Sequence, residues 1–380
     1  MATAAVRKPM SGAQWRVLVL LVVCITVNYF DRSNLSVAAP PIRTELGLSP
    51  AQLGLLLSGF FWTYAGFLPL SGWLVDRFHV GWVLAIGYFV WSAATAATGM
   101  VSAFWMIFAL RLLVGASESV AYPAFAKIFV AHFPEHHRGV ANGLIDAGSK
   151  IGPTVCTLLG GLAIAHYGWR VFFIVFGLAS LAWVGPWLLW MPHGAGAGAA
   201  RTEDTVPVRE LLANRDVRWS FLALFCANYY WYFLLTWLPS YFVMARHVSM
   251  ERMARLGALA YLAIAVASTA GGFLSDRWIA AGSTPTRVRK GFTAGGLLCA
   301  TVILPVAVIG DMRISMSLLI AACMAFGCFA GNHWALTQTL AGPLAAGKWT
   351  GLQNAAGNLA GVVSPAVTGW VVQQSGRSGT

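Results

Sequence analysis

The composition of the 380-residue chain limits what it can be. Hydrophobic residues make up 58% of it and charged residues only 10%, whereas soluble globular domains carry roughly 25% charged residues. A soluble fold is therefore excluded, and so are a disordered chain, a collagen and a disulfide scaffold. The 40 glycines and 17 tryptophans suit membrane helices, where small residues allow close packing and tryptophan marks the bilayer interface. We expect an all-α polytopic membrane protein.

Apolar segments recur along the chain, each near the roughly 20 residues that one membrane-spanning helix needs. Six lie in the first half, at residues 16–39, 51–75, 81–101, 104–130, 138–165 and 169–191. Five lie in the second half, at residues 218–244, 255–280, 290–310, 314–343 and 348–373. The polar stretch between them, 193–217, begins with a glycine/alanine run and ends in mixed charge. It predicts a cytoplasmic linker between an N-terminal bundle (1–192) and a C-terminal bundle (218–380).

Basic residues follow the topology of the predicted spans. With the N-terminus in the cytoplasm, most lysines and arginines fall on the cytoplasmic side, beginning with Arg7, Lys8 and Arg16. This distribution obeys the positive-inside rule. The formal net charge of +12 therefore reflects orientation in a bilayer, and we expect no nucleic-acid partner. The predicted location is a bacterial-type plasma (inner) membrane.

One six-residue motif occurs twice. Residues 72–77 read Gly-Trp-Leu-Val-Asp-Arg and residues 272–277 read Gly-Phe-Leu-Ser-Asp-Arg, each after the second span of its half. A second echo links the fifth and eleventh spans, where Gly139, Asn142 and Pro153 match Gly351, Asn354 and Pro365. Two related halves joined by a cytoplasmic loop are the architecture of many carriers that work by alternating access.

These motifs make the sequence resemble the major facilitator superfamily. The repeated G-x-L-x-D-R carries the resemblance, and two further motifs agree with it, Arg111-x-x-x-Gly115 and Pro134-Glu135-x-x-Arg138-Gly139. The resemblance implies two pseudo-symmetric helical bundles that alternate in access. The second half has five predicted spans where the superfamily has six, so we expect a C-terminal bundle without its sixth helix.

The repeated motif predicts a gating role for Asp76, Arg77, Asp276 and Arg277. We expect the two aspartates to cap neighbouring helix N-termini and to pair with nearby arginines, which would latch the halves when the cytoplasmic side is closed. A charge pair in a loop, without such a role, is the alternative.

Ionisable side chains inside the spans are the strongest indication of function, because each costs at least ~2.5–3.5 kcal/mol in the bilayer core. Those we find lie in the first half: Asp31, Arg32, Arg111, Glu118, Asp146 and Lys150. The second half offers neutral polar and aromatic groups: Asn228, Tyr229, Trp231, Tyr232, Trp237, Asn332, His333, Trp334, Gln338, Asn354 and Asn358. This asymmetry predicts proton coupling by the first half and orientation of an uncharged polyol or aromatic body by the second.

The acids and arginines of spans 1 and 4 have different expected roles. Asp31 and Glu118 can change protonation state when their surroundings change, which suits proton carriers. Arg32 and Arg111 cannot release a proton, so they suit fixed cations that hold a carboxylate. A purely structural ion-pair network is the alternative.

Asp146 and Lys150 are spaced to meet on one helix face, at i and i+4. The pair is either structural, or Lys150 faces the cavity and adds a cation that favours an anionic substrate.

A motif on span 1 makes the resemblance more specific, from the superfamily to one of its families. Its Asn28-Tyr29-Phe30-Asp31-Arg32 resembles the anion:cation symporter family of the superfamily, and spans 4 and 7 are similar to that family as well. The resemblance implies proton-driven uptake of organic anions, often sugar acids. It assigns proton transfer to Asp31 and Glu118, and anion contact to the adjacent arginines, to Tyr64 on span 2 and to Asn354 or Asn358 on span 11.

The predicted substrate contacts combine these lines of reasoning: Arg32, Tyr64, Arg111, Ser149, Lys150, Tyr229, Trp334, Gln338, Asn354 and Asn358. Hexonate carriers of the family have glutamine on helix 5, whereas this chain reads Gly148-Ser149-Lys150 there. Aromatic residues of span 7 can also stack on an aromatic acid. We therefore predict transport of an organic carboxylate of the hexonate, hexarate or aromatic class. We expect a monomer in the bilayer that uses protons and no cofactor.

Other readings stay open. A carrier that uses the arginines without net proton movement would exchange anions such as phosphate esters, and a chain without its last helix could be a sensor or a fragment that does not transport. His132, His136 and His137 favour a solvated loop over a metal site, and His333 fits a proton relay or a packing histidine. The sequence has no P-loop, HExxH, nucleophile elbow or dinucleotide fingerprint, so we do not expect an enzyme.

Overall fold

A computed structural model describes residues 10–192 and 207–377 of the chain. Every regular element in these ranges is a helix, and none of the residues described there forms a β-strand. Ten helical stretches within them are long and apolar enough to cross a membrane. These findings confirm the predicted all-α polytopic fold.

The chain divides into two compact units, and neither is one continuous stretch of sequence. Among the described residues, the first contains 10–152, 162–192 and 366–377, and the second contains 153–161 and 207–365. The short segment 153–161 thus groups with the second half of the chain, and residues 366–377 group with the first half.

The predicted linker, 193–217, is only partly described. Its residues 193–206 lie outside the described part of the chain. The remainder is largely helical, since it contains α9 (Val208–Ala213) and the start of α10 (Arg215–Ser240).

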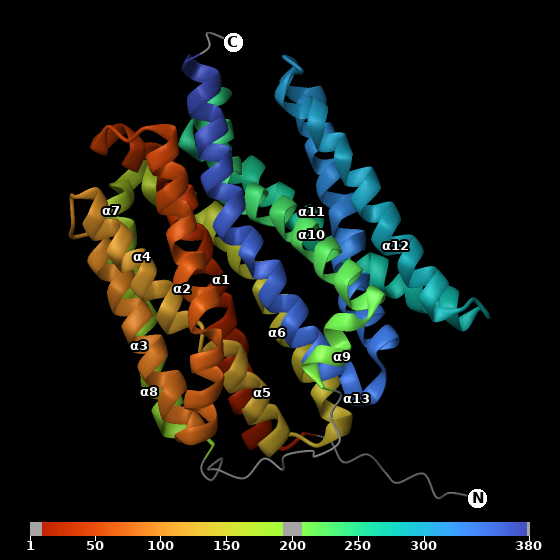
Figure 1. The fold of residues 1–380 in the computed structure, drawn as a ribbon. Helices are drawn as coiled ribbons and strands as arrows, with labels where there is room; N and C mark the ends of the chain where they lie inside the picture. The colour runs from red at the N-terminus through yellow and green to blue at the C-terminus, as the bar shows by residue number, and fades with distance from the viewer. Residues whose placement is uncertain (1–9, 193–206, 378–380) are drawn as a thin grey trace, which may run out of the picture. The chain divides into compact units, whose positions relative to one another are not determined.

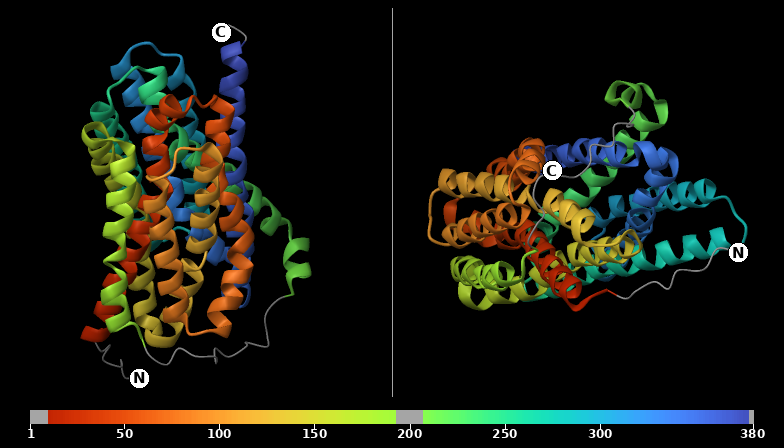
Figure 2. Two further views of the ribbon diagram at one scale, coloured as in Figure 1. Left: turned by 90° about the vertical axis from the view of Figure 1, so that its left-hand side faces the viewer. Right: turned by 90° about the horizontal axis from the view of Figure 1, so that it is seen from below.

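The first unit is built mainly from the helices of the first half. They are α1 (Gly12–Leu46), α2 (Pro50–Arg77), α3 (Val80–Thr98), α4 (Phe104–Glu118), α5 (Ala121–His132), α6 (Glu135–Val155), α7 (Gly161–Leu181) and α8 (Val184–Trp190). Helices α1 to α4 run lengthwise beside one another (Figures 1 and 2). Helix α4 packs against both α2 and α3, while α1 contacts α2, α5 and α8. The charged residues predicted on spans 1 and 4 therefore belong to one helical bundle.

Capping residues set the ends of α1 and α2. Ser11 and Gln14 form a reciprocal capping box at the start of α1, and Gly47 ends that helix in a left-handed conformation with a φ of 61°. Ser49 and Gln52 form the same box at the start of α2, with a proline at the first helical position. Helix α1 extends beyond the apolar run at 16–39 that predicted it, because the capping residues determine where the helix begins and ends.

A glycine separates two predicted spans that lie in one helical stretch. The stretch Val140–Trp190 contains Gly168, whose φ of 80° and ψ of 162° are not helical. A continuous helix of 51 residues would extend more than twice the bilayer thickness, so two spans require a break. The break falls between the spans predicted at 138–165 and 169–191. It explains why ten stretches correspond to eleven predicted spans.

Gly115 lets α4 approach α2 closely. A Cβ atom at Gly115 would lie 2.1 Å from the carbonyl oxygen of Phe60, which is closer than any side chain allows. Thr63 of α2 adds a hydrogen bond of 2.6 Å from its Oγ1 to the carbonyl oxygen of Leu112 on α4. The Arg-x-x-x-Gly motif of span 4 thus serves packing through its glycine, which sets the depth of Arg111 one turn earlier.

The second unit contains the π-helical segment η1 (Cys156–Gly160) and most helices of the second half. Besides α9 and α10 these are η2 (Tyr241–Ala245), α11 (Met250–Ala280), α12 (Pro285–Ala300), η3 (Thr301–Ala307) and α13 (Met312–Arg377) as far as residue 365. Helix α13 holds the two candidate spans Met312–Thr337 and Trp349–Ser375. Helix α11 packs against α10, α12 and η1. A Cβ atom at Gly257 of α11 would lie 2.8 Å from the methyl carbon of Thr157, so glycine allows the contact with η1.

Candidate functional site

Asp31 lies on α1 in the interior of the first unit, where it is 0% exposed. Its Oδ1 accepts a hydrogen bond of 2.7 Å from Nδ2 of Asn34, one turn further along α1, and another of 2.7 Å from Oγ1 of Thr95 on α3. Its Oδ2 has no hydrogen-bond partner among the described residues. One carboxylate oxygen is thus fixed by two donors, and the other can hold a proton or contact a water molecule.

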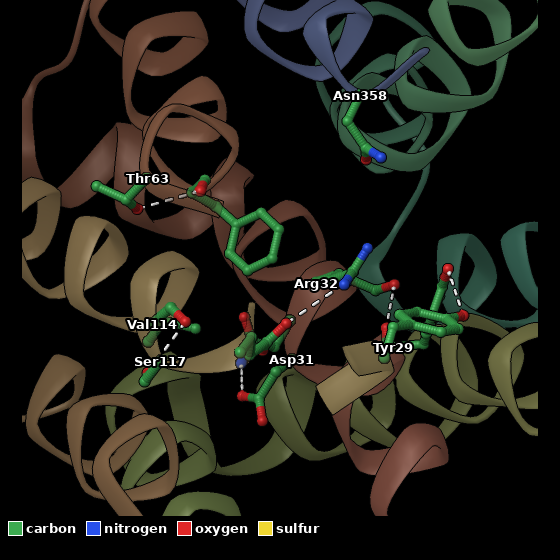
Figure 3. A network of polar contacts seen from close by, with 12 residues as sticks. Tyr29, Asp31, Arg32, Thr63, Val114, Ser117 and Asn358 are labelled. Atoms are coloured by element: carbon green, nitrogen blue, oxygen red, sulfur yellow. Dashed lines mark hydrogen bonds and ion pairs between the residues drawn. The ribbon is translucent and has the colours of Figure 1, made fainter. Parts of the chain in front are cut away.

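Arg32 connects α1 to α4 and α2. Its Nε lies 3.4 Å from Oε2 of Glu118, and both side chains are buried. The guanidinium carbon lies 4.3 Å from the ring centroid of Tyr64, 4.6 Å from that of Tyr29 and 5.2 Å from that of Phe60, all within cation–π range. Figure 3 shows the Arg32 side chain and its dashed contact. One carboxylate and several aromatic rings therefore hold this cation inside the bundle.

Arg111 of α4 binds α1 next to Asp31. Its Nη1 donates to the backbone carbonyl oxygen of Asp31 over 3.3 Å and to Oδ1 of Asn34 over 3.2 Å. Asn34 therefore bridges the Arg111 guanidinium and the Asp31 carboxylate. The ring of Phe60 lies 5.6 Å from the Arg111 guanidinium carbon, so both arginines face the same ring.

The structure thus brings together four of the charges predicted inside the spans, which we call the buried charge cluster: Asp31, Arg32, Arg111 and Glu118. With all four ionised, their formal charges cancel. The predicted contact Tyr64 lies against Arg32, as described above. Two members of the network were not singled out from the sequence. Asn34 could have been found by its i+3 spacing from Asp31, whereas nothing in the sequence distinguishes Thr95 from other threonines of apolar helices.

The charged residues of α6 pair with each other. Nζ of Lys150 donates a hydrogen bond of 2.8 Å to Oδ1 of Asp146, one helical turn away, and the Asp146 side chain is 60% exposed. Ser149 is buried, and its Oγ donates a hydrogen bond of 2.6 Å to the carbonyl oxygen of Asp146. This geometry favours the structural reading of the Asp146 and Lys150 pair.

The repeated motif forms one ion pair in each unit. Asp76 lies 3.7 Å from Nζ of Lys127, which also donates to the carbonyl oxygen of Val75. Asp276 lies 3.7 Å from Nη2 of Arg289, whose Nη1 donates to the carbonyl oxygen of Ala335 over 2.8 Å.

The expected partners of the motif therefore need one correction. Asp276 pairs with an arginine, but Asp76 pairs with a lysine, Lys127. Both aspartates lie near the C-terminal ends of α2 and α11, and their expected capping of neighbouring helix N-termini stays a prediction. Arg77 and Arg277 are exposed. Asp76 thus ties α2 to α5 and Asp276 ties α11 to α12, each within its own unit.

Two predicted contacts of the second unit belong to one polar group. Oη of Tyr232 on α10 donates a hydrogen bond of 2.7 Å to Oδ1 of Asn358 on α13. Nδ2 of Asn358 donates in turn to the carbonyl oxygen of Asn354 over 2.8 Å and to its Oδ1 over 3.1 Å. The carbonyl oxygen of Tyr229 accepts a hydrogen bond of 3.1 Å from Oγ of Ser364.

A second polar group of this unit is centred on Gln353, which the sequence reasoning missed. Gln353 is 0% exposed; its Nε2 donates to the carbonyl oxygen of Ser220 over 3.0 Å and lies 3.3 Å from Nε2 of His333. Thr337 donates to Oε1 of Gln353 over 2.9 Å. His333 also stacks on Phe329, with ring centroids 5.0 Å apart. The structure therefore places His333 in a packed, hydrogen-bonded setting.

Fewer contacts are described for the other predicted residues. The Trp334 ring lies 5.0 Å from that of His333. The side chains of Gln338 and His136 lie outside the described residues. Within the part of the chain that the structure describes, no group of three or more His, Cys, Asp or Glu residues could hold a metal ion.

Comparison with known proteins decides the family. The sequence model of the major facilitator superfamily matches residues 21–365, which is most of the chain. The chain belongs to the major facilitator superfamily. This superfamily member is a membrane transporter and not an enzyme, as expected from its lack of enzyme motifs.

Relatives and solved structures of the superfamily agree with this assignment. The chain is 31% identical to a protein of Cupriavidus necator named as a probable sulfoacetate transporter, over 95% of this chain and 88% of that one. It is 27% identical to a protein of Bacillus subtilis named as a probable galactarate/D-glucarate transporter, over 96% of this chain and 87% of that one. Its fold is similar to the inward-facing, occupied crystal structure of a bacterial homologue of the human lysosomal transporter Spinster, with a TM-score of 0.83 at 20% identity over 96% and 83% of the two chains.

Proposed function

We propose that this transporter carries an organic carboxylate into the cell together with at least one proton, by alternating access across the plasma membrane, with its N-terminus in the cytoplasm. The observation that carries the proposal is the buried charge cluster, in which the acids and arginines balance. The names of the similar proteins, which refer to sugar acids and to sulfoacetate, support an anionic substrate.

The Arg32 and Glu118 pair links the proton to the anion. In a bundle interior an arginine without a counter-ion is costly, so Arg32 requires a negative partner. Ionised Glu118 supplies that partner at 3.4 Å. When Glu118 takes up a proton, Arg32 loses its counter-ion, and a substrate carboxylate can replace it. Proton and anion then bind together. The anion replaces the counter-ion that Arg32 loses when Glu118 is protonated, and the proton removes the negative charge of Glu118 that would repel the anion.

Asp31 is suited to hold a second proton. Its Oδ1 is occupied by the Asn34 amide and the Thr95 hydroxyl, whereas Oδ2 has no partner among the described side chains. A proton on Oδ2 would remove one negative charge and leave both hydrogen bonds to Oδ1 in place. Arg111 stays charged and keeps α4 attached to α1 through its bonds near Asp31.

The aromatic rings around Arg32 hold the cation in place while it changes partner. Tyr64 and Tyr29 lie on α2 and α1 at 4.3 and 4.6 Å from the guanidinium carbon. Cation–π attraction of this kind is worth about 2 kcal/mol in a desolvated site, which offsets part of the cost of exchanging the carboxylate partner of Arg32. Tyr64 and Arg32 together form the proposed carboxylate contact of the first unit. The contacts predicted on the second unit, Tyr229, Trp334, Gln338, Asn354 and Asn358, are proposed to orient the rest of the substrate.

Proton uptake by the purified chain in liposomes tests the proposal. Hexonates, hexarates, sulfonated short acids and aromatic acids are added outside in turn, and external pH is recorded. Alkalinisation with one compound establishes symport and names its class. Asp31→Asn should abolish accumulation driven by a proton gradient while counterflow of labelled substrate persists. Asp146→Asn is the matched control, because that carboxylate is largely exposed.

Two results would contradict symport. Driven accumulation that persists in Asp31→Asn would remove Asp31 from proton transfer. Transport that requires substrate on the opposite side, without any pH change, would identify an anion exchanger.

A further inference from the structure

Buried polar side chains recur along α1 and α3, the helices that the Asp31–Thr95 hydrogen bond joins. Each member has a buried polar atom without a hydrogen-bond partner among the described residues: both amide atoms of Asn28, Oδ2 of Asp31, Oη of Tyr88, Nε1 of Trp91 and Oγ of Ser92. All five residues are 0% exposed. We call them the α1–α3 polar row. Buried polar groups in native proteins are nearly always satisfied, so this concentration along two helices requires an explanation.

The helix register places these residues at successive levels of α1 and α3. The hydrogen bond between Thr95 and Asp31 places the two residues at the same level. One turn before Asp31 on α1 lies Asn28, and one turn before Thr95 on α3 lie Trp91 and Ser92.

Contacts with α8 and its N-cap residue Trp183 indicate that both helices start at the same end of the unit. Nε1 of Trp183 donates to the carbonyl oxygen of Leu20 on α1 over 2.8 Å, and Nε1 of Trp187 donates to that of Gly81 on α3 over 2.9 Å. Residues one turn earlier on α1 therefore face residues one turn earlier on α3. Tyr88 extends the row by a further turn toward the start of α3, with its ring 4.6 Å from that of Trp91.

The mixture of donors and acceptors indicates what fills the row. The indole of Trp91 can only donate, ionised Asp31 can only accept, and the Asn28 amide needs both kinds of partner. A metal cation would satisfy the oxygen atoms and leave the Trp91 and Asn28 N–H groups unpaired. Water both donates and accepts, so it matches the complete set.

We propose that ordered water molecules occupy the α1–α3 polar row and form the path by which a proton reaches and leaves Oδ2 of Asp31. In each transfer an O–H bond forms at Oδ2 and one breaks in the adjacent water, which regains a proton from the next water along the row. No proton is created or lost, and no other reactant is needed. The proton path rests on the proposed proton coupling. The presence of ordered water is independent of that coupling.

The first test detects the water without any transport assay. X-ray radiolysis of the full chain in detergent oxidises aromatic residues that contact ordered water, and mass spectrometry measures the rate at each site. Trp91 and Trp187 are matched, since both are 0% exposed, but Nε1 of Trp187 is bonded to Gly81. We expect Trp91 to be oxidised several-fold faster than Trp187. Equal rates would overturn the water row.

The second test addresses the path. Asn28→Leu replaces the two amide atoms by methyl groups and Ser92→Ala removes the hydroxyl, and counterflow of labelled substrate in the same liposomes reports the amount of folded protein. We expect the ratio of net proton uptake to counterflow to fall several-fold in both variants. Thr98→Val is the control on α3, because its buried hydroxyl already donates to the carbonyl oxygen of Ala94 over 2.9 Å.

The outcomes separate the two proposals. Absence of proton uptake by the unchanged chain would overturn the proposed symport and the path with it, while radiolysis would still decide on the water. Proton uptake by the unchanged chain, with ratios in Asn28→Leu and Ser92→Ala equal to that of Thr98→Val, would overturn the path alone.

Discussion

The two units bury polar groups of opposite kinds inside similar apolar helices. The first unit holds carboxylates against arginines, as in the 3.4 Å contact of Arg32 with Glu118. The polar groups of the second unit that we describe, around Asn358 and Gln353, use amides, hydroxyls and an imidazole. A charge in such surroundings persists only while its partner is charged, so we assign the proposed proton coupling to the first unit. The hydrogen bonds around Asn358 join uncharged groups, which fits the proposed role of the second unit in orienting the substrate.

The largest expected effect comes from separating the buried ion pair. Arg32→Gln leaves Glu118 buried without a counter-ion, which should destabilise the folded chain by about 3–5 kcal/mol at alkaline pH, where Glu118 stays ionised, and by less where it takes up a proton. The double variant Arg32→Gln with Glu118→Gln should recover most of that stability and still fail to transport. Chemical denaturation in detergent and uptake in liposomes measure the two quantities. A single variant as stable as the double one would show that the pair has no electrostatic role.

An intermediate effect is expected from the neutral group of the second unit. Tyr232→Phe removes the 2.7 Å hydrogen bond to buried Asn358. The free energy of substrate binding should weaken by about 1 kcal/mol, which corresponds to a roughly fivefold lower apparent affinity. The number of protons carried per substrate should not change. Tyr230→Phe is the matched control on α10, because the buried Tyr230 hydroxyl has no partner among the described residues. A changed proton ratio in Tyr232→Phe would contradict the division of roles between the units.

The smallest effect is expected at the exposed pair of α6. Asp146→Asn should change the free energy of unfolding by no more than about 0.5 kcal/mol, because Asp146 is largely solvated, and high salt should remove the difference. The KM for transport is measured for both Asp146→Asn and Lys150→Gln. Equal small effects on KM leave the pair structural, whereas a much larger KM in Lys150→Gln would assign the lysine to the substrate site.

Charged residues of the candidate site were predictable from the sequence, and most neutral ones were not. Asp31 and Glu118 stand out because carboxylates are rare inside apolar segments. Thr95 and Gln353 do not, since single hydroxyls and amides in such segments often serve packing alone. The lysine that pairs with Asp76 was also unforeseen, because Lys127 lies far from it in the sequence.

The sequence by itself determined the helical membrane fold, the superfamily and the side chains that bear charge in the spans. These follow from local quantities, namely the length of apolar runs, the repeated motif and the cost of each charge in a bilayer. Only the tertiary structure decided the pairing, in which Arg32 meets Glu118 while its neighbour Asp31 meets Thr95. Successive residues point about 100° apart around a helix, so Asp31 and Arg32 face different neighbours. Which neighbours they meet depends on how deeply the helices approach, as at Gly115, and no local pattern encodes that depth.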